Sequence, residues 1–222
     1  KPVVYQIPGR KELLSEKREQ MAVIGAGPAG LFAAYLLAQR GYCPHIYERG
    51  RAVEERQQDV EDFWNGGALD PESNVQFGEG GAGTFSDGKL NTLVKDKFGR
   101  SRYVLETFVK FGAPEDILYV AKPHVGTDVL RDVISRMRQE IIRLGGTFHF
   151  STKVTDLHIE DGRISKIELN HKEWKDVSGV ILAIGHSARD TFEMLYERKV
   201  PMMAKSFAVG MRVEHPQDMI NE

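Results

Sequence analysis

The chain has 222 residues, of which 41% are hydrophobic and 28% are charged, and its formal net charge is −2. These values are typical of a globular protein with one large or two small domains. The net charge gives no overall attraction to nucleic acid or to an anionic membrane, and no apolar run is long enough to span a bilayer. The single cysteine, Cys43, excludes an internal disulfide and a C-x-x-C pair. We therefore expect a reducing, cytoplasmic setting, with no metal site, no nucleic-acid partner and no membrane association.

Residues 21–50 predict a βαβ unit of the kind that binds dinucleotides. Met21–Ile24 is an apolar run suited to a buried parallel strand, and the apolar residues of Pro28–Gln39 recur at helical spacing. A second strand, His45–Tyr47, ends at Glu48. Between the first strand and the helix the sequence is G-x-G-x-x-G, and we expect the whole turn to contact the cofactor through Gly25, Ala26, Gly27, Pro28, Ala29 and Gly30.

Each glycine of this turn has a physical reason. Gly25 permits the tight turn, Gly27 lets a pyrophosphate lie against bare backbone, and Gly30 lets the helix pack closely on the strands. The helix N-terminus then offers free N–H groups and about half a unit of positive charge. Glu48 lies roughly 20 residues downstream, where a carboxylate can accept hydrogen bonds from ribose hydroxyls.

The next segments predict helices and a glycine-rich loop. The charged stretch Arg10–Gln20 is expected to be a solvated helix or a linker, and Arg51–Trp64 a polar helix. A glycine-dense loop spans residues 77–90. A short helix over residues 101–112 is expected to begin at a Ser101 cap, and a longer one to run from a Thr127 or Asp128 cap to Leu144.

After Leu144 the hydrophobic period changes from 3.6 to 2, which predicts strands. Thr147–Ile159, Arg163–Asn170 and Lys172–Val177 alternate, with a hairpin turn at Asp161-Gly162. The apolar run Gly179–Ile184 reads as a buried parallel strand that rejoins the first sheet. We therefore expect an α/β fold, in which a Rossmann-like domain with a parallel sheet carries a three-stranded antiparallel meander within residues 147–177. A simple NAD dehydrogenase would instead continue to alternate strand and helix.

This order of elements, with Ala183-Ile184-Gly185 at the end of the last strand, resembles the FAD-binding domain of the two-dinucleotide-binding-domain flavoproteins, the glutathione-reductase-like superfamily. The resemblance implies that Ala183 and Gly185 approach the flavin nucleotide. It also implies that backbone near Val154 contacts the adenine.

A closer resemblance rests on four segments: VQFGEGGAGTFSDGKLNT (75–92), KPHVGTDVL (122–130), ILAIGHSARDTFEML (181–195) and SFAVGMRVEHPQDMIN (206–221). Together they are similar to a group of bacterial FAD-dependent dehydrogenases of uncharacterised substrate. That resemblance implies a fragment of a longer protein: residues 1–20 as a linker or helix from a missing N-terminal region, residues 21–200 as the FAD-binding domain, and residues 201–222 as the start of a second, substrate domain. The Gly-Asp segment with which such proteins return to the flavin does not occur in the chain.

The glycine-rich loop has two interpretations. Its backbone N–H groups can approach a pyrophosphate or a flavin ring, with Gly80, Gly81, Gly83 and Thr84 as the expected contacts, or the loop can be a flexible surface turn. Asp87 and Lys89 are candidate acid/base residues or a solvated pair.

The sequence allows two alternative roles for each of His186 and Arg49. His186 follows the Ala-x-Gly strand end, so it is a candidate proton donor or acceptor beside the flavin, or the cap of the next helix. Arg49 is expected to contact the cofactor by neutralising a phosphate, or to pair at the surface with Glu54 and Glu55.

These observations predict an FAD-dependent oxidoreductase that holds FAD non-covalently, with an unknown substrate and NAD(P)H as one candidate electron donor. Alternatives are a non-catalytic flavin-binding or regulatory module and an RNA-modifying flavoprotein, which the net charge disfavours. The sequence leaves the oligomeric state and the electron acceptor open.

Overall fold

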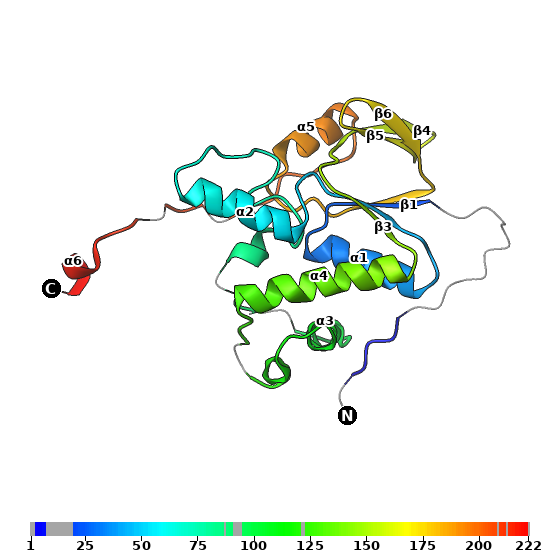
Figure 1. Cartoon of the computed structure of the whole chain (residues 1–222). Coiled ribbons are helices and arrows are strands. Elements are labelled where there is room, and N and C mark those ends of the chain that lie inside the picture. The colour runs from blue at the N-terminus through cyan, green and yellow to red at the C-terminus, as the bar shows by residue number, and fades with distance from the viewer. Residues whose placement is uncertain are drawn as a thin grey trace.

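A parallel β-sheet forms the middle layer of the structure, a computed structural model that describes residues 3–7, 20–86, 88–90, 95–120, 123–207, 209–211 and 213–221. Helices cover one face of this sheet, and an antiparallel meander with one helix covers the other (Figure 1). The predicted α/β class, a Rossmann-like domain with a parallel sheet and a three-stranded meander, is confirmed.

The parallel sheet has the strand order β3-β2-β1-β7. Its strands are β1 (Met21–Ile24), β2 (His45–Tyr47), β3 (Thr147–His149) and β7 (Gly179–Leu182). β1 lies in the centre because its residues are apolar on both faces: Ala22, Val23 and Ile24 are all at most 5% exposed. β7 pairs with β1 from Met21↔Gly179 to Ile24↔Leu182, so the last strand rejoins the first sheet as predicted.

The helical layer packs on the face of the sheet to which Val23 and Ile46 point. It contains α1 (Pro28–Gln39), α3 (Arg100–Lys110), the short 3-10 helix η2 (Glu115–Leu118) and α4 (Thr127–Arg143). α4 contributes Val133, Met137 and Ile141 at helical spacing, each at most 1% exposed. α1 and α4 lie side by side under the sheet (Figure 1).

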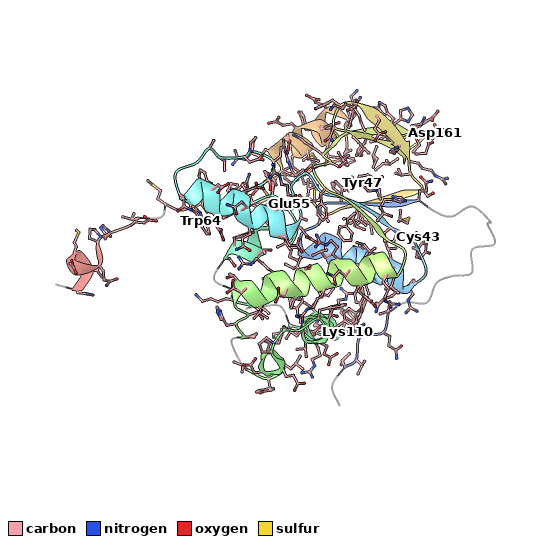
Figure 2. The ribbon with its side chains drawn as sticks, viewed as in Figure 1. Cys43, Tyr47, Glu55, Trp64, Lys110 and Asp161 are labelled. Atoms are coloured by element: carbon pink, nitrogen blue, oxygen red, sulfur yellow. The ribbon has the colours of Figure 1, made fainter. Side chains whose placement is uncertain are left out.

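The opposite face is covered by the meander and by α5 (Arg189–Glu197). The meander consists of β4 (Val154–Glu160), β5 (Arg163–Leu169) and β6 (Glu173–Asp176) in antiparallel order. Asp161 and Gly162 form its outer turn with φ of 51° and 72°, as the Asp-Gly signal predicts (Figure 2). Leu157, Ile167 and Leu169 pack inward against Ala22 and Ile24.

Three local predictions are wrong. The expected strand Thr147–Ile159 is two strands in two sheets: the chain turns after His149, where Ser151 adopts φ of 50°, so β3 extends the parallel sheet and only β4 belongs to the meander. Neither Ser101 nor Thr127 or Asp128 caps its helix. Gly99 and Gly126 occupy the N-cap positions without a side-chain cap, and the Asp96 carboxylate accepts hydrogen bonds from the first turn of α3 instead.

The remaining elements lie at the edges. α2 (Val53–Trp64) and the 3-10 helix η1 (Ala82–Phe85) flank the end of the sheet, and α6 (Gln217–Asn221) stands apart from the body at the end of an extended segment (Figure 1). The described side chains of residues 201–221 are all exposed. Most of residues 1–20 lie outside the described residues, so the proposed division into linker, FAD-binding domain and second domain stays a prediction.

A first prediction concerns the helical layer. Replacing Ile141, which is 0% exposed, with alanine should lower the free energy of unfolding by about 2–5 kcal/mol, since it removes packed methyl groups and leaves a cavity. The adjacent Ile142 is 50% exposed, and its replacement by alanine should change the free energy by about 0.5 kcal/mol or less. Urea denaturation of both variants measures the difference, and equal losses would contradict the packing described for α4.

Candidate functional site

A pocket of about 510 Å³ lies at the carboxyl ends of β1, β2 and β7. The loop that follows each of these strands lines it, so residues distant in sequence meet at one edge of the sheet. This edge is where open α/β sheets bind ligands. We call this pocket of about 510 Å³ the strand-end pocket. The predicted residues Gly25, Gly27, Pro28, Ala29, Glu48, Arg49, Gly81, Val154, Ala183, Gly185 and His186 all line it.

The glycines of the first turn divide into two kinds. At Gly25, with φ of 98°, an added Cβ would lie 2.5 Å from the carbonyl oxygen of Ala183, and at Gly30 it would lie 1.8 Å from the carbonyl oxygen of Gly25. Both therefore serve the fold. At Gly27 the nearest atom to an added Cβ is the Cα of Gly81 at 3.8 Å, so the fold leaves this position bare and open to the pocket.

The N-terminus of α1 faces the same place. Gly27 is its N-cap, no side chain caps it, and Pro28 has no N–H group. The first intrahelical bond of the helix is donated by Leu31 to the carbonyl of Gly27, which leaves the N–H groups of Ala29 and Gly30 without an intrahelical acceptor. The positive end of the helix dipole and these N–H groups together favour an anion.

Glu48 is buried, 5% exposed, and its carboxylate accepts hydrogen bonds from three backbone N–H groups. Oε2 accepts from Ala26 at 2.7 Å, and Oε1 accepts from Gly50 at 2.9 Å and from Gly78 at 3.1 Å. The three donors belong to the turn after β1, the turn after β2 and the glycine-rich loop. A carboxylate has about four acceptor positions, so Oε2 retains capacity for one further donor from the pocket.

A buried arginine shapes the glycine-rich loop. Arg56, on α2, is 0% exposed and donates hydrogen bonds to the carbonyl oxygens of Asn74, Gly78, Glu79 and Gly81 at 2.7–3.3 Å. At Gly78 an added Cβ would lie 2.4 Å from the Cδ of Arg56. The loop thus wraps around the guanidinium, and Gly80 donates its N–H to the carbonyl of Ala26. The alternative of a flexible surface turn does not fit a loop held in this way.

Glu79 accompanies Arg56 in this buried cluster. Its Oε2 accepts hydrogen bonds from the Val53 amide and from Arg138, both at 2.9 Å, while Oε1 has no partner among the described residues. Burial raises the pKa of Glu79 to about 7, against the lowering effect of Arg138 and of the Val53 N–H. Burial also lowers the pKa of Arg56 to about 10, opposed by Glu48 and Glu79.

Arg49 lines the pocket but is held by two carboxylates. Its Nε donates to Glu72 at 2.6 Å, and its two terminal nitrogens donate to Asp190 at 3.1 and 2.8 Å. The expected surface pairs with Glu54 and Glu55 are wrong, because Glu54 pairs with Arg138 instead. The guanidinium lies 4.2 Å from the centroid of the Phe77 ring.

The other candidates separate into two places. His186 is exposed and lines the strand-end pocket; α5 begins after Ala188 without a side-chain cap, so the alternative of a helix cap is wrong. Gly80, Gly83 and Lys89 line a second cavity of about 460 Å³, which we call the apolar cavity. The structure therefore does not bring His186 and Lys89 together.

Three of the described candidates line neither cavity. Thr84, within the glycine-rich loop, is buried, and its Oγ1 has no hydrogen-bond partner among the described residues. Ala26 and Gly30 contribute backbone to the turn rather than a surface to the pocket. Asp87 lies outside the described residues.

Several residues of the site were missed in the sequence. Glu72, Lys153 and Asp190 are charged residues to which the sequence pattern assigns no role, and nothing in the sequence brings them together. Arg56 carries a signal that could have been used: with Val53 and Val60 it occupies the buried stripe of α2 at helical spacing. A cation in an apolar stripe indicates a buried partner.

Comparison with known proteins agrees with this geometry. Residues 23–59 match the family model of the NAD(P)-binding Rossmann-like domain. An uncharacterized protein of Clostridium beijerinckii is 50% identical over 218 residues, which cover 98% of this chain and 40% of that protein. Thiamine thiazole synthase of Thermotoga maritima is 24% identical over 209 residues, which cover 89% of this chain and 66% of the enzyme.

Among solved structures, THI4 of Thermovibrio ammonificans aligns with a TM-score of 0.53 and 17% identity, over 82% of this chain and 64% of that one. The chain thus covers less than two thirds of each of these proteins. The matches establish a Rossmann-like dinucleotide-binding fold. No helix among the described residues has the length and apolar character needed to cross a membrane.

A second prediction concerns Glu79. The pKa of this carboxyl rises from 4.5 to about 7 on folding, so the folded state favours its protonated form. The associated stability is present below pH 4.5 and is lost as the pH rises through about 7. Relative to Glu79→Gln, the free energy of unfolding of the wild type should fall by up to about 3 kcal/mol between about pH 5 and pH 8. Denaturation curves across this range measure it, and parallel pH profiles of the two proteins would contradict it.

Proposed function

We propose that the chain is the FAD-binding domain of an FAD-dependent oxidoreductase whose substrate is not yet known. One observation carries the proposal: the strand-end pocket and the apolar cavity meet at the N-terminus of α1, where both are lined by Pro28 and Ala29. A path that runs from the strand-end pocket with Glu48, past a helix N-terminus, into an apolar cavity matches the order of adenosine, pyrophosphate and flavin in an extended FAD molecule.

The adenosine end fits the pocket between β2 and β4. Glu48 has an acceptor position left for a ribose hydroxyl, and a hydrogen bond to such a charged acceptor contributes about 1.5–3 kcal/mol. Backbone at Thr152 to Val154 lines the same part of the pocket and would lie beside the base. A simple NAD dehydrogenase would alternate strand and helix and would lack the meander that supports this edge. The presence of the meander therefore favours FAD over NAD as the ligand.

The pyrophosphate fits the bare surface at Gly27. The N–H group of Ala29, which lines the pocket, and the dipole of α1 would hold its charge. Gly81 lies beside Gly27, with its Cα 3.8 Å from an added Cβ at Gly27, so two neighbouring stretches of backbone without side chains would border the phosphate.

The flavin end would lie toward the apolar cavity, whose walls include Phe32, Phe108 and Met137. FAD, when bound, supplies hydride or electron transfer, and the chain orients it and excludes water. Lys89, which lines this cavity, remains a candidate for moving a proton near the ring, as does Asp87. His186 lines the strand-end pocket instead, so its role as a proton donor or acceptor beside the flavin would need a ring that extends toward that pocket. NADH or NADPH remains a candidate electron donor. The activity of the whole protein, its substrate and its partners belong to this proposal, as does a cytoplasmic location.

A third prediction tests the cofactor. Gly27→Leu should reduce FAD retention at least about a hundredfold, because the side chain would occupy the phosphate position while the fold has room for it. The measurement is the flavin absorbance per chain after reconstitution, with circular dichroism to confirm the fold. Gly126→Leu is a control: an added Cβ at Gly126 meets nothing within 4 Å, the one at Gly27 makes an ordinary contact at 3.8 Å, and Gly126 lines neither cavity. Full FAD retention in Gly27→Leu would overturn the assignment.

A fourth prediction separates an enzyme from a module that binds flavin without turnover. In the full-length protein, NADH or NADPH should bleach the flavin absorbance, and an added electron acceptor should restore it. The flavin is followed anaerobically near its visible absorbance maximum. A flavin that no donor reduces would favour the non-catalytic alternative, and a colourless protein that binds NADH would remove both flavin interpretations.

A further inference from the structure

Four charged side chains form a closed ring at the rim of the strand-end pocket. Arg49 binds Glu72 at 2.6 Å and Asp190 at 2.8 Å, and Lys153 binds the same two carboxylates at 3.2 and 2.5 Å. Each cation therefore contacts both anions, and each anion contacts both cations. We call these four residues the charge ring.

The charge ring joins four separate segments around the pocket. Arg49 follows β2, Glu72 lies in the loop after α2, Lys153 precedes β4 and Asp190 lies in the first turn of α5. Arg49 and Lys153 line the pocket, and they are the only lysine or arginine among the described residues that do so. Both cations that a bound nucleotide can meet are thus already paired.

The pairing favours the charged form of Asp190. Burial alone would raise the pKa of Asp190, but hydrogen bonds from Arg49 and Lys153 hold it well below its usual range. The Arg49 side chain is only 14% exposed. Its guanidinium lies over the Phe77 ring and donates hydrogen bonds to carboxylates from both of its edges. The ring has two positive and two negative charges, so it presents no net positive charge to the pocket.

Arg49 brings the charge ring next to the proposed ribose-binding residue. It directly follows Glu48, the residue that the proposed function places at the ribose hydroxyls. An arginine beside that acidic position can accommodate a 2′-phosphate, because a guanidinium binds a phosphate through two parallel hydrogen bonds. In this chain Glu72 and Asp190 occupy the donors that such a phosphate would need.

We propose that the charge ring makes the strand-end pocket specific for adenosine nucleotides whose ribose 2′-hydroxyl is free, and that Glu72 and Asp190 are the residues that exclude a 2′-phosphate. This proposal rests on the proposed function, since it takes the pocket to be a nucleotide site. It predicts that FAD and NAD(H) are compatible with this pocket and that NADP(H) is not, so that an NADPH donor would need a separate site.

The test compares two isomers, ADP and adenosine 2′,5′-bisphosphate, which differ only in where the second phosphate is attached. Calorimetric titration of the wild-type chain should show ADP binding about 100-fold more tightly or better. A 2′-phosphate would find the donors of Arg49 and Lys153 already occupied by Glu72 and Asp190, and only the second phosphate of ADP reaches the proposed pyrophosphate position at Gly27. The double variant Glu72→Gln/Asp190→Asn frees Arg49 and Lys153. It should reduce the ratio of ADP affinity to adenosine 2′,5′-bisphosphate affinity at least about tenfold.

A matched double variant controls for the change in net charge. Asp156→Asn/Glu140→Gln also removes two carboxylates that pair with arginines, Arg198 and Arg143, and neither residue lines the pocket. This control variant should leave the ratio of ADP affinity to adenosine 2′,5′-bisphosphate affinity unchanged. The single variant Glu72→Gln retains Asp190 and provides an intermediate ratio if the double variant unfolds, which circular dichroism would reveal.

The outcomes separate the two proposals. Equal binding of both isomers by the wild type would overturn the specificity proposal alone. An unchanged ratio in folded variants of the ring would show that Glu72 and Asp190 do not exclude the phosphate. Binding of neither isomer would overturn the proposed function and the specificity proposal with it.

Discussion

The carboxylate of Glu48 is the interaction on which the geometry of the strand-end pocket depends. Three loops converge on it, each through one backbone N–H group: the turn after β1 at Ala26, the turn after β2 at Gly50 and the glycine-rich loop at Gly78. A buried charge that lost these donors would carry a large desolvation cost, so the loops and the carboxylate stabilise one another. Glu48, which was predicted to contact a ligand, therefore also has a structural role in holding the three loops together. Its remaining acceptor position would be held in place by the same bonds before any nucleotide arrives.

Arg56 complements Glu48 from the other side of the glycine-rich loop. Glu48 holds an N–H group of this loop and Arg56 holds its carbonyl groups, so the loop is fixed through both kinds of backbone polar group. The two side chains attract each other through a region of low dielectric, which opposes the lowering of the Arg56 pKa by burial. A loop rich in glycine loses much conformational entropy when it is fixed. The buried arginine and carboxylate offset that loss, and they leave the surface toward the pocket free of side chains.

The sequence predicted the fold well because its signals are local. The G-x-G-x-x-G turn, the Asp161-Gly162 hairpin and the apolar strands each depend on neighbouring residues, and the structure contains all three. The helix-cap errors are local, since Gly99 and Gly126 take the N-cap positions in place of the predicted residues. The other errors arise where distant parts of the chain decide. The split of Thr147–Ile159 follows from pairing of β3 with β2, and Arg49 pairs with Glu72 and Asp190 because the loop after α2 and the helix α5 fold onto the end of β2. Charges at such separations have no periodic pattern from which to infer contact.

The two groups of glycines show how far a motif by itself can be interpreted. Gly25 and Gly30 exclude a side chain because backbone atoms of the same fold already occupy the space, so any protein with this turn needs them whether or not it binds a nucleotide. Gly27 differs, since an added Cβ there would make only one ordinary contact, at 3.8 Å, so the fold around it does not demand glycine and a ligand would account for the bare position. The motif as a whole therefore indicates the turn, and Gly27 alone indicates an occupant. Because this bare position faces the free N–H groups of α1, the occupant it favours is an anion that lies against backbone.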